Sequence, residues 1–192
     1  HANPVFRYYQ EPDPIRRHFK PVSVIPSVAQ AAMIGNPVSM PRVIHLARKY
    51  DAAAGERKLF VAEVTEQQIM DWQLTANNYG NIVCTHGGES LAGLVAARKQ
   101  GLVEDSETAV LNSTAHALKF SDFQQMYFDN TFPPEYQVVP NPDLVNSPQL
   151  VEVPDIDRPR PGHPLSGPAL TEFVTQTARE IAARLELEEV SP

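Results

Sequence analysis

The chain has 192 residues, of which 42% are hydrophobic and 20% charged, and this balance suits a soluble globular protein with a buried core. Its formal net charge of -7 argues against nucleic acid as a main partner, and no apolar run is long enough to span a membrane. With Cys84 as its one cysteine the chain forms no internal disulfide, and with no secretory signal at its start we expect a cytoplasmic protein.

The first 26 residues mix aromatic side chains with prolines and begin at His1 rather than at methionine, which favours a fragment or a processed chain. Pro12 and Pro14 argue against a regular helix, so we expect one short strand at most, followed by a loop. The basic cluster between Arg16 and Lys20 has the charge to touch a phosphate, but the pattern favours a solvated loop.

From about residue 27 to residue 120, segments with a helical period alternate with short apolar runs. The first half should contain a helix of about two turns over 28–33, a helix from Ser39 to Gly55, a strand over 59–64 and a helix opened by the capping box of Thr65 and Gln68. After these we expect a strand over 82–84, a helix that follows Gly88 and is stopped by Gly101, a strand over 108–111 and a helix start over 115–120. This alternation predicts an α/β fold of three layers, with a mostly parallel sheet and helices on both faces.

After residue 130 the composition changes, because ten of the 18 prolines fall between Pro133 and Pro168. The sequence therefore predicts three parts: an α/β domain over 1–130, a proline-rich extended segment over 131–167, and a C-terminal part over 168–192. The last part contains an apolar stripe with a helical period up to about residue 187, and we expect this helix to dock on the rest of the molecule or on a partner subunit.

Two turns have the composition of ligand sites. Ser113 and Thr114 follow the expected strand over 108–111, and in an open α/β sheet ligands bind where strands end. Hydroxyl groups there can both donate and accept a hydrogen bond, although an ordinary capping turn has the same pattern. The second turn, Thr85 to Gly88, contains His86 and two glycines that allow close approach of the backbone to a ligand.

Other chemistries find less support. The histidines are scattered and do not have the spacing of a metal site. Ser113 and His116 are too close along one turn for a hydrolytic triad. Lys119 follows the first turn and has the amine needed for a Schiff base, but the pattern favours a surface lysine at the start of a helix.

Four stretches, taken together and in order, resemble threonine synthases, a family of fold-type II enzymes that depend on pyridoxal 5'-phosphate. They are His1-Ala2-Asn3-Pro4, the segment AQAAMIGNPVS from Ala29 to Ser39, Cys84-Thr85-His86-Gly87-Gly88, and the segment STAHALKF from Ser113 to Phe120. The resemblance covers about residues 1–125, and the proline-rich tail and last helix lie outside it. It implies that the chain is the C-terminal part of the large cofactor domain.

The resemblance also implies roles for particular residues. A hydroxyl, which we assign to Thr114 with Ser113 as the second choice, would donate to the pyridine nitrogen of the cofactor. Ala29 or Ala31 would lie against the cofactor ring, and His86 would lie near it without a role that we assign.

The sequence departs from the family at four positions in these turns. Thr85 replaces a common proline, Gly87 a common threonine, Glu89 an apolar residue, and Ala117 a glycine or proline. These changes put the contacts of the turn after Cys84 in doubt, and with them any role for His86.

In threonine synthases the Schiff-base lysine and the glycine-rich phosphate loop precede the region matched here. The resemblance therefore implies that this chain is inactive alone, contains no catalytic residue and needs the N-terminal half of the same enzyme as its partner, with a homodimer as a further possibility. The complete enzyme would convert O-phospho-L-homoserine and water to L-threonine and phosphate. Two alternatives stay open: another fold-type II lyase such as a threonine or serine dehydratase, and a non-catalytic stand-alone binding or dimerisation module.

Overall fold

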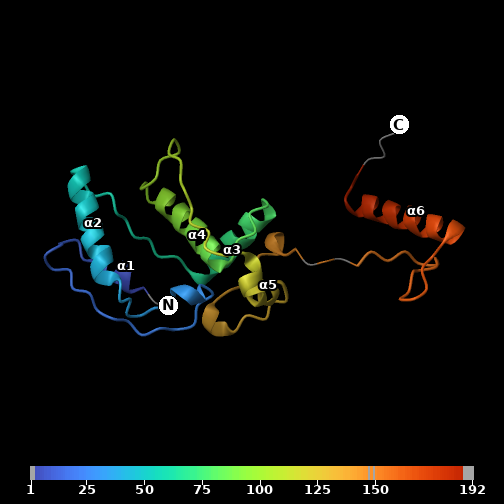
Figure 1. The fold of residues 1–192 in the computed structure, drawn as a ribbon, viewed down its shortest axis with the longest axis horizontal. Helices are drawn as coiled ribbons and strands as arrows, with labels where there is room; N and C mark the ends of the chain where they lie inside the picture. The colour runs from blue at the N-terminus through green and yellow to red at the C-terminus, as the bar shows by residue number, and fades with distance from the viewer. Residues whose placement is uncertain (1–2, 147, 149, 188–192) are drawn as a thin grey trace. The chain divides into compact units, whose positions relative to one another are not determined.

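The computed structural model describes residues 3–146, 148 and 150–187, and Figure 1 shows helices joined by long irregular segments. His1 and Ala2 of the first resembling stretch and residues 188–192 of the expected C-terminal part lie outside the described residues. The α-helices are α1 (Pro4–Gln10), α2 (Met40–Ala54), α3 (Glu66–Asn78), α4 (Thr85–Lys99), α5 (Ser121–Phe128) and α6 (Gly167–Arg184). Short 3-10 turns are η1 (Gln30–Ala32), η2 (Ala117–Phe120), η3 (Pro134–Tyr136) and η4 (Pro142–Leu144). The chain forms two compact units, residues 1–146 and residues 147–192.

The expected mostly parallel sheet, and with it the three-layer α/β fold, is wrong. The described part of the chain contains no strand, and its only bridges are two isolated antiparallel ones, Val83 with His116 and Arg160 with His163. A strand needs a neighbour, because each of its backbone N–H and C=O groups must find a partner. The apolar runs over 59–64 and 108–111 find no such neighbour and stay irregular. The second run is open to solvent, with Val110 94% exposed, whereas the first is partly buried and its Val64 packs against the core.

One end of each of two helices is confirmed by its cap, while Ser39, the expected N-cap of α2, makes no capping hydrogen bond. Pro41 lies in the first turn of α2, and Gly55 ends this helix with a φ of 71°, a left-handed conformation that glycine adopts without strain. At α3 the capping box is confirmed, because Thr65 Oγ1 accepts a hydrogen bond from Gln68 N at 3.2 Å and Gln68 Oε1 accepts one from Thr65 N at 2.8 Å.

Three local predictions need correction. The short strand expected near the N-terminus is α1, which Pro4 opens at a position where a helix tolerates proline. The expected two-turn helix over 28–33 is only the 3-10 turn η1, and α4 begins at Thr85 instead of after Gly88. In each case an isolated apolar or glycine-containing stretch takes its conformation from the surfaces around it.

Helices α3 and α4 pack side by side, as Figure 1 shows, and Gly88 is the residue that allows their close approach. A Cβ atom at Gly88 would clash with the carbonyl oxygen of Ile69 and lie 3.0 Å from the backbone nitrogen of Gln73, both on α3. Because backbone atoms cannot swing aside as a side chain can, only glycine fits here.

The core of residues 1–146 forms where α3, α5 and the segment before η4 meet. Its buried members are Val28, Ala29, Ile69, Met70, Leu74, Phe123, Tyr127 and Val138. Tyr127 is fully buried, and its hydroxyl donates to Asp71 Oδ1 at 2.6 Å and accepts from Asn141 N at 2.8 Å. Burial and then the hydrogen bond to Asp71 raise the pKa of Tyr127, so the hydroxyl keeps its proton.

Residues 131–146 of the proline-rich segment belong to this compact unit. Gln67 on α3 binds Val139 at both backbone groups, with Val139 N donating to Gln67 Oε1 at 2.7 Å and Gln67 Nε2 donating to Val139 O at 2.9 Å. The aromatic ring of Phe132 stacks on that of Phe123 with their centres 6.1 Å apart. A segment whose regular structure is limited to the short turns η3 and η4 is therefore fixed by side chains of α3 and α5.

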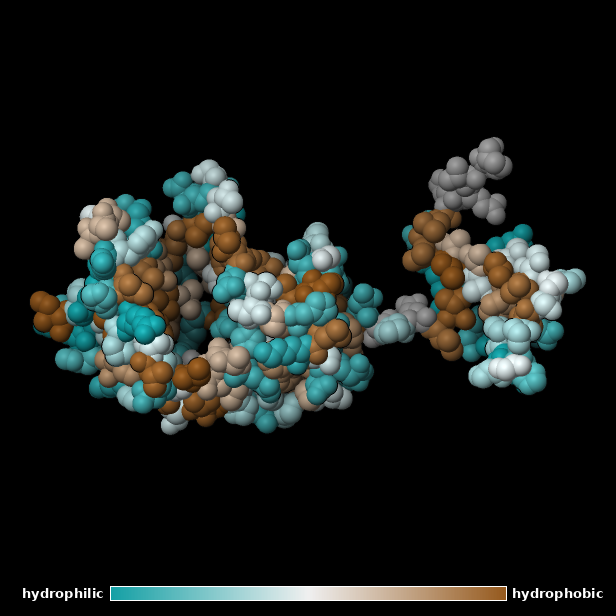
Figure 2. Space-filling view, viewed as in Figure 1, coloured by the Kyte–Doolittle hydropathy of each residue, from teal (hydrophilic) through white to brown (hydrophobic). Residues whose placement is uncertain are grey.

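The unit formed by residues 147–192 contains α6, the terminal helix that the sequence predicts. Arg184 Nη1 donates to the carbonyl oxygen of Leu150 at 3.2 Å, which ties the end of α6 to the segment before it. Apolar side chains of α6 are open to solvent in Figure 2, among them Val174 at 55% and Ile181 at 40% exposure. None of the described helices combines the length and apolar character needed to cross a membrane.

We expect Tyr127→Phe to lower the free energy of unfolding by about 1–3 kcal/mol, because it removes the buried hydroxyl that donates to Asp71 and accepts from the N–H of Asn141. Urea denaturation followed by circular dichroism measures the change. Tyr79→Phe is the matched control, because this ring is 82% exposed, and its effect should stay within about 0.5 kcal/mol. Equal effects of the two substitutions would contradict the role of the Tyr127 hydroxyl.

We expect Gly88→Ala to lower the free energy of unfolding by about 1–3 kcal/mol, since α3 and α4 must separate to admit the new methyl group. Gly93→Ala, on the same helix, meets no atom within 4 Å and should be neutral or stabilising, because alanine favours a helix by roughly 0.5–1 kcal/mol over glycine. Thermal unfolding of the two variants gives the comparison. A Gly88→Ala protein as stable as Gly93→Ala would show that the two helices do not need this close contact.

Candidate functional site

Three of the segments that resemble threonine synthase meet at the N-terminal end of α4. Cys84 N donates to Ala115 O at 3.0 Å, and Ser90 Oγ donates to Asn112 O at 3.2 Å. Ala31 N donates to His86 Nε2 at 3.1 Å. Residues 84–90 at the start of α4 therefore contact both the segment over 112–116 and the turn η1.

His86 is the side chain that links these segments. Its Nε2 accepts the hydrogen bond from Ala31, its Nδ1 lies 3.6 Å from Cys84 Sγ, and the centre of its ring lies 5.4 Å from that of Phe120. Burial lowers the pKa of His86, and the positive charge of Lys119 lowers it further. A neutral imidazole can accept at Nε2, so the ring favours the form that keeps Ala31 in place.

Ser113 and Thr114 lie between the two anchors of their segment, Asn112 and Ala115. Both residues are exposed, and neither hydroxyl makes a hydrogen bond with the described residues. A hydroxyl held by its backbone and free at its oxygen can donate to an acceptor on a bound molecule. Each of these two side chains thus has the position and the chemistry of a ligand contact.

The two predicted alanines have different surroundings. Ala29 is buried, at 3% exposure, and lines a cavity of about 400 Å³ together with Ala32 and Gly93. Ala31 is exposed and does not line this cavity, and neither do His86, Ser113 or Thr114. The structure therefore brings Ala31 to His86, but it does not gather all five predicted residues in one pocket.

The sequence reading missed the carboxylates of this cavity. Glu66 is buried at 3% exposure, and its Oε2 accepts hydrogen bonds from Val28 N at 2.7 Å and from Ser27 Oγ at 3.1 Å. Glu89 also lines the cavity, and burial, followed by the negative charge of Glu66, raises its pKa. One signal was available, since Glu89 stands where threonine synthases have an apolar residue.

The described residues supply shape and hydrogen bonds but no buried amine. All five lysines, Lys20, Lys49, Lys58, Lys99 and Lys119, are exposed. The Lys119 ammonium lies 5.5 Å from the centre of the Phe120 ring, in keeping with a surface lysine. Among the described residues no group of three or more His, Cys, Asp and Glu side chains could hold a metal ion.

The comparisons with known proteins agree with the resemblance to threonine synthases. No protein-family model matches the chain. Over 120 residues, or 62% of its length, the chain is 32% identical to threonine synthase 2 of Arabidopsis thaliana, which is a chloroplast protein. The aligned stretch covers 22% of that enzyme, so the chain spans about a fifth of the length of this relative. Over this aligned stretch the sequence is thus threonine synthase-like.

We expect the free energy of unfolding to fall as the pH drops below about 6.5, the pKa of an unperturbed histidine, because the unfolded chain then binds a proton that folded His86 resists. Urea denaturation at neutral and acidic pH measures this. His86→Gln should remove part of the fall, whereas His45→Gln, at an exposed position of α2, should leave it unchanged. An acid destabilisation that persists undiminished in the His86 variant would exclude this residue as its source.

Proposed function

We propose that this chain is the C-terminal part of a threonine synthase-like enzyme that converts O-phospho-L-homoserine and water to L-threonine and phosphate. The observation that carries the proposal is the hydrogen-bonded meeting of η1, the start of α4 and the segment over 112–116. These are the same stretches that resemble the family, and the similarity to the plant enzyme spans 120 residues.

The cofactor of the proposed enzyme is pyridoxal 5'-phosphate, which supplies an electron sink for loss of phosphate and addition of water. In the proposal, the Thr114 hydroxyl donates to the pyridine nitrogen, with Ser113 as the second choice. Both hydroxyls are exposed and without a partner among the described residues, as such a contact requires. A neutral hydroxyl suits an unprotonated ring nitrogen, whereas a carboxylate would favour its protonation.

The other predicted residues act on shape. Ala29 and Ala31 have side chains small enough to let a flat ring approach the backbone of η1. His86 acts as a positioning residue, because its Nε2 is already engaged by Ala31 N and is not available to a ligand at the same time. In the proposed enzyme His86 therefore sets the distance between η1 and the start of α4.

In this proposal the remaining catalytic groups belong to the N-terminal half of the enzyme, which would pack against this unit. The chain has no buried lysine, so the Schiff-base lysine and the phosphate loop would belong to the N-terminal half of the enzyme, and this chain alone would be inactive. Surface for that half is available, because apolar residues of the irregular runs are exposed, among them Phe60 at 43%, Ile82 at 47% and Val110 at 94%.

The proposal is tested on the protein that joins this chain to the N-terminal half of the proposed enzyme. Phosphate release from O-phospho-L-homoserine and the formation of threonine are measured together. We expect Thr114→Ala to lower kcat roughly five- to tenfold through the loss of one hydrogen bond, with a smaller effect of Ser113→Ala. Thr108→Ala, at an exposed position before the same turn, is the matched control and should leave kcat unchanged.

Two outcomes would contradict the proposal. Deamination of threonine or serine without phosphate release would favour a threonine or serine dehydratase that uses the same cofactor. A natural product that consists of this chain alone, binds no pyridoxal 5'-phosphate and has no activity would favour a binding or dimerisation module. A Thr114 variant with full activity would leave the reaction in place and overturn only the assignment of the hydroxyl.

A further inference from the structure

A second cavity, of about 380 Å³, lies beside α1 and is lined by basic side chains. Arg7 comes from the last turn of α1, and Arg16, His18 and Lys20 come from the loop that follows it. The whole chain has a net charge of -7, so this concentration of cations runs against the average charge of the molecule. None of the residues assigned to the proposed cofactor site lines this cavity.

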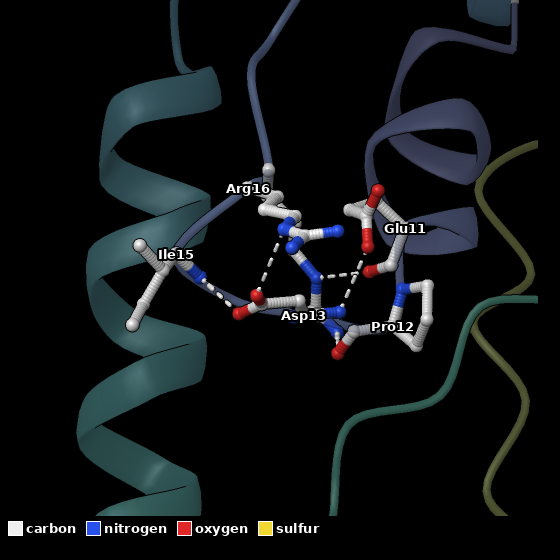
Figure 3. A network of polar contacts seen from close by, with 6 residues as sticks. Glu11, Pro12, Asp13, Ile15 and Arg16 are labelled. Carbon is white, nitrogen blue, oxygen red and sulfur yellow. Dashed lines mark hydrogen bonds and ion pairs between the residues drawn. The ribbon is translucent and has the colours of Figure 1, made fainter.

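The acidic groups nearest to these cations are engaged in holding the loop. Glu11 also lines the cavity, and its Oε1 accepts from Asp13 N at 3.0 Å. Asp13 accepts from Ile15 N at 2.9 Å and pairs with Arg16 Nε at 3.4 Å, as Figure 3 shows. That ion pair is exposed and therefore weak, and it leaves the two terminal nitrogens of Arg16 outside the contact.

The loop is also fixed from its other end. Arg17 Nε donates to Glu11 O at 2.7 Å and Arg17 Nη2 donates to Pro12 O at 3.2 Å, while the guanidinium carbon lies 5.0 Å from the centre of the Tyr9 ring. These bonds fix the turn between α1 and the loop that carries Arg16, His18 and Lys20. Because this loop is already held in place, a ligand that binds its cations costs little backbone entropy.

The wall of the cavity is partly apolar. Tyr8 is buried at 5% exposure, and its hydroxyl accepts from Arg48 Nη2 at 3.3 Å, which fixes the ring. Val22 lines the same cavity, and its backbone N–H donates to Gly35 O at 3.0 Å. A cavity with a rigid apolar wall and a rim of cations suits a small anion that carries an organic group as well as a free anion.

We propose that this cavity binds a phosphate group, either as inorganic phosphate or as the phosphate monoester of a small organic molecule. Arginine binds two phosphate oxygens with its planar fork, and lysine adds a compact charge with three N–H donors. Arg7, Arg16 and Lys20 supply these groups around one space, and His18 adds a ring N–H. The proposal does not depend on the threonine synthase-like function, because the two sites share no residue.

The test is a titration of the 192-residue chain, observed by NMR of its backbone amides at low ionic strength. Inorganic phosphate and O-phosphoserine are the two probes, and the tighter one identifies the form of the ligand. We expect saturable binding with a Kd of about 1 mM, and a loss of about tenfold in affinity for the double variant Arg7→Gln, Lys20→Gln. The control is Arg42→Gln, Lys49→Gln, which removes the same charge from exposed positions of α2 and should bind as the unchanged protein does.

Added sodium chloride should weaken binding, because it screens the exposed cations. The amides that shift should belong to residues 7–22. Three results would overturn the proposal: the absence of saturable binding by both probes, equal weakening by the two double variants, or shifts confined to other parts of the chain. Circular dichroism of each variant confirms that these surface changes leave the helices intact.

Discussion

The backbone contact between α3 and α4 at Gly88 determines where the candidate site lies. Gly88 falls in the first turn of α4, and its missing side chain lets that turn press on the backbone of Ile69 and Gln73. His86 is two residues before this contact. Because α4 is held against α3 at Gly88, the position of the His86 imidazole relative to α3 is fixed as well. The hydrogen bond from Ala31 and the anchoring of residues 112–115 both depend on that position.

The opposite side of α3 carries the second constraint. Asp71 and Gln67 project from α3 toward the segment that precedes η4, where they bind the Tyr127 hydroxyl and both backbone groups of Val139. The Tyr127 bonds are partly buried, whereas the Gln67–Val139 pair is exposed, so the buried hydroxyl is the member that adds most to specificity and stability. Helix α3 thus supports the candidate site on one face and the irregular chain after α5 on another. A substitution that disrupts the packing of α3 should therefore affect both regions.

How much of this followed from the sequence depends on how local each signal is. The caps of α2 and α3 were predictable because Gly55, Thr65 and Gln68 act on their own helix within a few residues. The sheet was predicted wrongly because an apolar run such as 108–111 does not reveal whether a neighbour exists to pair with it.

The same limit applies at the candidate site. Composition and motif pointed to the turns that contain His86 and Thr114, but the Ala31–His86 bond joins residues 55 positions apart and has no local signature. The buried setting of Glu66 was equally hidden, because a glutamate after a capping threonine is ordinary in an exposed helix. Long-range contacts of this kind decide which turns become sites, and only a structure supplies them.

The irregular run over 108–111 has a consequence for how the isolated protein behaves at high concentration. Val110 and Leu111 are exposed, and the N–H groups of the run find no acceptor among the described residues. An apolar stretch with free backbone donors is a template for edge-to-edge pairing with another copy, the route by which unprotected chains aggregate. A second polypeptide that covered this run would therefore also protect the chain from aggregation.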